Sequence, residues 1–158
     1  MRPKKYKCKL FNDNRGYLKE ITPKMINSKF IYSILTNSKR NVLRGMHFNK
    51  RMDEEKLVYI VDGKILDVSV NLKKGKNFGK IFYYNLKKND ILIIPKGFAH
   101  GYLCLGKSNT VLYLINKKYS AKNNTGFIWN DKKFKIKWNI KNPNLSKKDK
   151  NLKKYILS

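Results

Sequence analysis

Acidic residues, histidines and cysteines are scarce in this sequence. Its 158 residues include 10 Asp and Glu against 37 Lys and Arg, with two histidines and two cysteines. Two cysteines cannot build the disulfide framework of a small secreted domain. Because no apolar signal-peptide core follows the basic start, we expect a cytoplasmic protein in which Cys8 and Cys104 are free thiols.

Long hydrophobic stretches are also missing. No apolar run approaches the roughly 20 residues that cross a bilayer as a helix, so we expect no membrane association. The formal net charge of +27 would suit an anionic partner such as nucleic acid. However, the lysines are spread from Lys4 to Lys154, and Lys, Asn, Ile and Tyr are all frequent, as AT-rich coding favours. We therefore assign most of the charge to composition and expect no nucleic-acid partner.

The sequence does contain a dense series of short strand patterns. Hydrophobic residues make up 41% and aromatic residues 13%, which is enough to bury a core. The clearest pattern is a hairpin in which residues 57–61 and 64–71 flank Asp62-Gly63. About ten such strands with almost no helix predict a single all-β domain over residues 1–158, an antiparallel sandwich or barrel.

The other expected elements follow from alternation and turn residues. A helical turn is expected over residues 23–28, where Thr22 would be the N-cap and Pro23 the first position. Residues 145–152 are expected to form a turn or a short helix. The remaining strands are expected at residues 6–10, 17–21, 30–36, 41–48, 81–86, 90–94, 99–105, 110–115, 127–130 and 136–138.

Both histidines lie in apolar, strand-like segments. A cupin metal site would need two or three histidines and a carboxylate that converge on one cation. Neither His47 nor His100 has a second histidine or a closely spaced carboxylate beside it in the sequence, so we expect no metal. The two histidines are then either core residues or acid–base groups.

Four neighbouring features favour an acid–base role for His47. Lys56 begins the strand that follows the His47 loop. Arg44 lies three residues before His47, so it either faces the other way in a regular strand or reaches the rim of a pocket. Asp67 and Tyr113 place polar groups in otherwise apolar strands, where an unpaired carboxylate would be costly.

Several motifs occur in a fixed order along the chain. They are Arg44-Gly45-Met46-His47-Phe48, Lys56-Leu57-Val58, Asp67-Val68-Ser69-Val70, Phe78-Gly79-Lys80, Ile94-Pro95-Lys96-Gly97-Phe98-Ala99-His100-Gly101, Trp129-Asn130-Asp131 and Leu145-Ser146-Lys147-Lys148-Asp149. Asp13-Asn14-Arg15-Gly16-Tyr17 and Glu20 precede them. Over almost its whole length, the chain resembles the dTDP-4-dehydrorhamnose 3,5-epimerase family of cupin-like nucleotide-sugar epimerases.

The resemblance implies a jelly-roll, cupin-like β-barrel that is usually a dimer and needs no metal or organic cofactor. It implies epimerisation of a nucleotide-diphosphate sugar beside its C4 ketone, through an enolate. His47 would be the base, and Asp149 would fix its tautomer and orientation. Tyr113 would be the acid on the opposite face of the sugar. Lys56 would stabilise the negative charge that develops on the enolate oxygen.

The resemblance also implies a substrate-binding shell. Arg15, Arg44 and Lys148 would contact the substrate, and arginine forks suit a pyrophosphate. Glu20 and His100 would make polar contacts to the ligand. Asp67 would be the buried partner of His100, and Tyr119 would stack on the base.

The chain departs from the family pattern at several places, among them the segment between Glu20 and Phe30 and the loop between His47 and Lys56, which are both shorter, and Leu114 and Lys118, which replace more typical residues. Tyr32-Ser33-Ile34 replaces a strand that commonly carries Gln and Asn, and Asn124 stands where Glu is common. Epimerisation at one carbon only, or of a GDP, CDP or heptose substrate, therefore stays an alternative. A sugar 3,4-ketoisomerase would need a different histidine arrangement. A nucleic-acid-binding β-barrel would give no role to the motif around His47 or to Asp149.

Overall fold

The computed structural model describes residues 1–21 and 29–156, which contain twelve strands and one short helix. The predicted helical turn at residues 23–28 lies outside the described residues. No helix in the described part of the chain has the length and apolar character needed to span a membrane. The elements are β1 (Lys4–Lys7), β2 (Lys9–Asp13), β3 (Gly16–Glu20), β4 (Tyr32–Lys39), β5 (Leu43–Asn49), β6 (Lys56–Asp62), β7 (Lys64–Asn71), β8 (Ile81–Lys87), β9 (Asp90–Ile94), β10 (Phe98–Cys104), β11 (Ser108–Ile115), β12 (Asn124–Gly126) and α1 (Lys147–Lys150).

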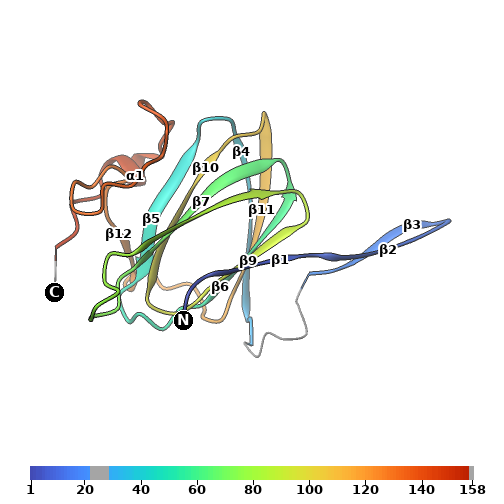
Figure 1. Cartoon of the computed structure of the whole chain (residues 1–158), viewed down its shortest axis with the longest axis horizontal. Helices are drawn as coiled ribbons and strands as arrows, with labels where there is room; N and C mark the ends of the chain where they lie inside the picture. Colours follow the sequence, from blue (N-terminus) through green and yellow to red (C-terminus); the bar gives the residue numbers. More distant parts are fainter. Residues whose placement is uncertain (22–28, 157–158) are drawn as a thin grey trace.

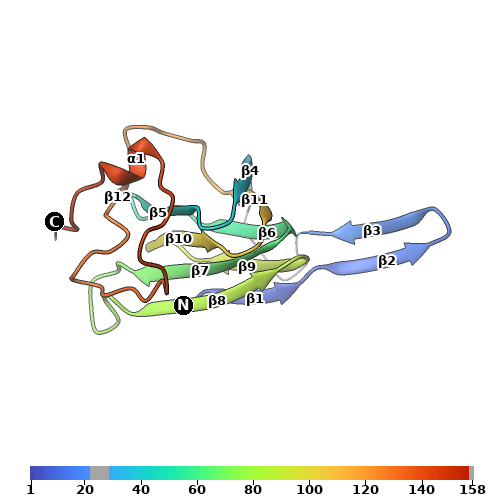
Figure 2. The ribbon, with the colours of Figure 1, turned by 90° about the horizontal axis from the view of Figure 1, so that it is seen from above.

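Two five-stranded antiparallel sheets form the body of the molecule. The first has the order β1-β9-β6-β11-β4 and the second the order β12-β5-β10-β7-β8. They lie against each other as two layers, with β1 and β4 at the edges of the first sheet (Figure 1; Figure 2). The prediction of an all-β, jelly-roll or cupin-like antiparallel architecture with little helix is confirmed.

The core between the sheets follows from the period of two along each strand. On β6, Val58 and Ile60 join the cluster between the sheets, whereas Leu57 and Tyr59 belong to a separate cluster on the outer face. Strand β10 is buried along its whole length, because its outer face is covered as well. The central strands of both sheets are therefore buried on both of their faces.

The irregular segment that begins at residue 127 covers the outer face of the second sheet. Phe127, Phe134, Ile136 and Trp138 pack there with Leu43, Met46 and Val68. The predictions of strands at residues 127–130 and 136–138 are wrong, since these residues form turns and irregular segments. Every second residue is apolar because one side of this segment lies on the sheet, which produces the same pattern as a strand. The predicted short helix is present as α1.

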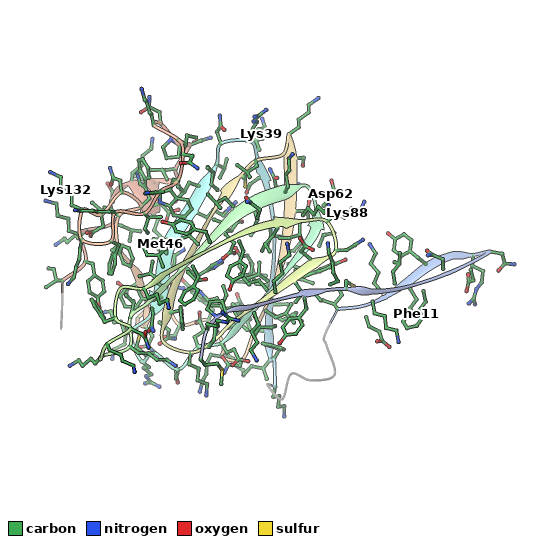
Figure 3. The ribbon with its side chains drawn as sticks, viewed as in Figure 1. Phe11, Lys39, Met46, Asp62, Lys88 and Lys132 are labelled. Carbon is green, nitrogen blue, oxygen red and sulfur yellow. The ribbon has the colours of Figure 1, made fainter. Side chains whose placement is uncertain are left out.

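A separate hairpin projects from the body. The predicted strand at residues 6–10 is divided at Cys8: β1 pairs with β9, whereas β2 pairs with β3 and with no other strand of the described residues. The β2–β3 hairpin extends away from both sheets in the two views, and Phe11 lies on it far from the core (Figure 3). Leu10, Phe11, Tyr17 and Leu18 are all exposed on this hairpin. Both cysteines are free thiols, as predicted.

Candidate active site

A cavity of about 260 Å³ opens between the two sheets. One wall comes from β5 and β10, the opposite wall from β4 and β11, and the rim from the β5–β6 loop and α1. The lining residues are Tyr32, Ile34, Thr36, Arg44, His47, Glu54, Lys56, His100, Tyr102, Tyr113, Ile115, Lys117, Tyr119, Asn124, Ser146, Lys148 and Asp149.

A β-bulge on β5 brings Arg44 and His47 to the same face. His100 pairs with His47 and Tyr102 pairs with Arg44, so two residue steps on β10 match three on β5. The extra residue lies around Gly45, whose φ is +129°. A Cβ at Gly45 would lie 2.6 Å from the Cα of Gly101, so only glycine allows this close approach of the two strands. The bulge resolves the alternative left open by the sequence: Arg44 reaches the pocket.

His47 is held by a carboxylate from the far end of the chain. Its Nε2 lies 2.6 Å from Oδ1 of Asp149, and the side chains are 27% and 5% exposed. The Ser146 hydroxyl caps α1 by accepting a hydrogen bond from the Asp149 amide, which fixes the carboxylate on the first turn. When Nε2–H donates to Asp149, the imidazole lone pair is on Nδ1, which can then accept a proton.

The pKa of Asp149 reflects this arrangement. Burial acts to raise the pKa of the carboxyl group, but the hydrogen bond and charge of His47, the Ser146 hydroxyl and nearby Lys148 outweigh it. The net effect is a pKa below the usual value. Asp149 is therefore ionised at neutral pH and can stabilise a protonated His47.

Tyr113 lies on the opposite wall, and its environment keeps its phenol protonated. Burial is the main reason why its pKa lies well above the ordinary value, and the nearby Tyr102 hydroxyl and Asp67 carboxylate add to the effect. The ring of Tyr113 lies edge-on to that of His100, with 6.0 Å between centroids. A neutral phenol is a proton donor, which is the state a general acid needs.

Several cations line the cavity. Lys56 forms an ion pair with Glu54 at 3.0 Å, and Lys117 forms one with Asp53 at 3.1 Å. The Nε of Arg44 donates to the Ser38 hydroxyl at 3.0 Å, so the guanidinium is anchored by one edge.

The second histidine forms a deeper pair. Nε2 of His100 lies 2.6 Å from Oδ2 of Asp67, and the two side chains are 5% and 0% exposed. His100 still lines the cavity, while Asp67 lies behind it on β7. Each histidine thus has one carboxylate partner. Among the described residues, no group of three or more His, Cys, Asp and Glu is placed to hold a metal ion.

Most of the site residues predicted from the sequence meet in this cavity. His47, Asp149, Tyr113 and Lys56 line it together with Arg44, His100, Tyr119 and Lys148. Arg15 and Glu20 are not among the described residues that line it. Arg15 lies in the turn between β2 and β3, where its guanidinium contacts Asp13 at 2.7 Å, and Glu20 is the last residue of β3. Their roles in substrate binding stay predictions.

Sequence reasoning missed several lining residues. Glu54 and Lys117 looked like ordinary charged loop residues, and no pattern singled them out. Thr36 was not predicted either. In the structure its hydroxyl lies 3.0 Å from that of Tyr102. Ser146 had a usable signal, because Ser-x-x-Asp before a helix is a capping pattern.

The arrangement can move a proton across a small molecule. A carboxylate-held imidazole and a neutral phenol line opposite walls of one cavity, with a lysine beside them. This set suits removal of a proton from carbon on one face and its return on the other, with an oxyanion stabilised between the two steps.

Comparisons with known proteins point to one family. Residues 4–156 match the family model described as dTDP-4-dehydrorhamnose 3,5-epimerase. The chain belongs to the dTDP-4-dehydrorhamnose 3,5-epimerase family. The epimerase of this name from Shigella flexneri is 34% identical over 96% of this chain and 90% of its own length. That from Salmonella typhimurium is 35% identical over 89% and 84%.

Solved structures of family members have the same fold. The epimerase from Bacillus anthracis, with TDP and pyrophosphate bound, is 33% identical with a TM-score of 0.89, covering 97% of this chain and 94% of that one. The enzyme from Legionella pneumophila, in complex with dTDP-4-keto-L-rhamnose, is 27% identical with a TM-score of 0.87, covering 96% and 87%. The chain is thus a member of a family of isomerases that epimerise 4-keto sugars.

Proposed function

We propose that this protein is a nucleotide-sugar 3,5-epimerase that converts dTDP-4-dehydro-6-deoxyglucose to dTDP-4-dehydrorhamnose in the cytoplasm. One observation carries the proposal: the His47–Asp149 pair and the protonated Tyr113 line the same cavity from different sheets. Neither a simple binding module nor a ketoisomerase explains why a base and an acid are placed on opposite walls.

In this proposal Nδ1 of His47 removes the proton from a carbon next to the C4 ketone. The electron pair of the broken C–H bond moves into the ring, and negative charge develops on the C4 oxygen near Lys56. The phenol of Tyr113 then gives its proton to the same carbon from the other face and becomes a phenolate. Proton return from His47 to Tyr113 through solvent resets the pair. The same residues serve C3 and C5, because both carbons flank the ketone.

The cations that line the cavity support binding of a nucleotide diphosphate. Arg44 and Lys148 line the cavity near His47, and an arginine fork matches two phosphate oxygens. The exposed ring of Tyr119 also lines the cavity, where it is available to stack on a base. The solved relatives that hold TDP or a dTDP-sugar support the choice of nucleotide.

The test is proton exchange in deuterated water. With dTDP-4-dehydro-6-deoxyglucose, we expect the enzyme to place deuterium at C3 and C5, followed by NMR. A Tyr113→Phe variant should still exchange the starting sugar but lose product formation by about 10²-fold or more, since the acid is gone and the base remains. Exchange at only one carbon would replace the proposal with monoepimerisation, and no exchange on any nucleotide 4-keto sugar would end it.

We further propose that the enzyme is a homodimer in which the β2–β3 hairpin packs on the partner. Four exposed apolar side chains on this hairpin would be unusual on a lone projecting element. Arg15 and Glu20 could then reach the cavity of the second copy. Sedimentation should give a dimer, and Phe11→Asp should weaken it. Mixing His47→Ala with Arg15→Ala protein should restore activity only if Arg15 acts across the interface.

A further inference from the structure

The wall formed by β4 and β11 differs in chemistry from the rest of the cavity. On β4 the side chains of Tyr32, Ile34 and Thr36 alternate with exposed residues and line the cavity. Ile34 pairs directly with Tyr113 on β11, and Tyr32 pairs with Ile115. Because directly opposed residues have Cβ atoms about 5 Å apart, Ile34 lies beside the proposed acid on the same wall.

The hydroxyl of Thr36 on this wall already has hydrogen-bond partners within the protein. The Thr36 hydroxyl contacts the Tyr102 hydroxyl at 3.0 Å and donates to the Val111 carbonyl at 3.4 Å. The phenol of Tyr32 is at the rim, where the residue is 36% exposed. Between the rim and Tyr113, the wall therefore presents the branched hydrocarbon side chains of Ile34 and Ile115.

The opposite wall and two lysines carry the hydrogen-bonding groups. Arg44, His47 and His100 line the β5–β10 side, and Lys56 and Lys148 also line the cavity. A sugar held between the two walls therefore has one side toward charged and polar side chains, and its other side lies against Tyr113 and the two isoleucines. A hydroxyl pressed against isoleucine loses water and gains no partner, which costs about 10-fold to 100-fold in kcat/KM.

We propose that Ile34 and Ile115 are specificity-determining residues, which select a 4-keto sugar that carries no hydroxyl group where it meets them beside Tyr113. The inference rests on the proposed function and adds which part of the sugar must lack a hydroxyl group. It predicts that discrimination between sugars lies in this wall, separate from the acid–base groups.

The experiment compares kcat/KM for three dTDP-4-keto sugars: the 6-deoxy sugar, its 2-deoxy analogue and its 6-hydroxy analogue. The 6-deoxy sugar is compared with each of the two analogues. In at least one of these two comparisons, the wild-type kcat/KM should be about 10-fold or more higher for the sugar with fewer hydroxyl groups. Ile34→Asn supplies a hydrogen-bonding group at this place, so it should reduce that ratio to a few-fold by raising kcat/KM for the more hydroxylated sugar. The two sugars whose kcat/KM ratio changes differ at one carbon, and that carbon is the one that lies against Ile34 and Ile115.

Two matched controls accompany this variant. Ile34→Val keeps the wall apolar and should keep the ratio. Leu35→Asn makes the same polar change on the other face of β4, where the residue is 65% exposed, and should also keep it. If circular dichroism shows Ile34→Asn to be unfolded, Ile115→Thr is the second variant, with the same expected direction.

The outcomes separate the two levels of the proposal. Equal kcat/KM for all three sugars in the wild type, or a ratio that Ile34→Asn or Ile115→Thr leaves unchanged while exchange continues, overturns the role of this wall alone. Absence of exchange with every sugar overturns the proposed function, and this inference with it.

Discussion

The molecule contains two His–Asp pairs with the same distance between their bonded atoms but with different surroundings. In each, Nε2 of the histidine lies 2.6 Å from a carboxylate oxygen. In the outer pair the carboxylate of Asp149 comes from α1, and His47 is 27% exposed. In the inner pair His100 and Asp67 lie on neighbouring strands, and the side chains are 5% and 0% exposed.

The difference lies in what each pair can exchange with the cavity. His47 lines the cavity with its side chain 27% exposed, and its partner lies on a separate helical turn, so the imidazole can exchange a proton with a molecule in the cavity. His100 also lines the cavity, but its side chain is only 5% exposed and the Asp67 side chain behind it is fully buried. Breaking such a buried pair leaves a buried polar group unpaired, which costs stability, whereas breaking the outer pair costs chemistry.

The largest effect is expected from His47→Ala. Removal of the base should lower the rate of deuterium incorporation at C3 and C5 by about 10²-fold to 10⁴-fold, while the melting temperature changes little. NMR and calorimetry on the same preparation measure both. Near-wild-type exchange in the folded variant would contradict the assignment of His47 as the base.

The next effect is expected from His100→Ala, and here stability changes most. Asp67 would be left without its partner inside the sheet, and the loss is expected to be about 3–5 kcal/mol in the free energy of unfolding. Urea denaturation of His100→Ala and His47→Ala, side by side, gives the comparison. If His47→Ala proves as destabilising as His100→Ala, the two pairs do not differ as argued.

The sequence predicts one pair better than the other for physical reasons. Strands β5 to β11 follow from alternation and turn residues, and the cost of a lone carboxylate in an apolar strand indicates that Asp67 has a partner, although only the resemblance identifies that partner as His100. The outer pair could be predicted only by resemblance, because residues 47 and 149 are far apart in the chain and no local pattern joins them. The bulge at Gly45 that turns Arg44 into the pocket depends on the approach of Gly101, a contact between strands that periodicity does not contain.

A smaller effect is expected from Asp149→Asn, which keeps the size of the partner and removes its charge. The imidazole loses the carboxylate that orients it and stabilises its protonated form, so exchange should fall by about 10²-fold. Because Asp149 acts through His47, the pH profile of kcat should also change shape, which a merely structural role would not produce. Asp67→Asn is the matched variant of the inner pair and should leave that profile unchanged.

The smallest expected effect is on acid stability. The pKa of Asp149 is lower in the folded protein than the usual value near 3.8, since the contributions of His47, Ser146 and Lys148 outweigh that of burial. A lowered pKa stabilises the folded state above the unfolded pKa, and this contribution is lost as the pH falls through the folded pKa. The difference in unfolding free energy between wild type and Asp149→Asn should therefore shrink between about pH 5 and pH 2. Urea titrations at several pH values test this, and a difference that stays constant over that interval would show that His47 does not hold the carboxylate in its charged form.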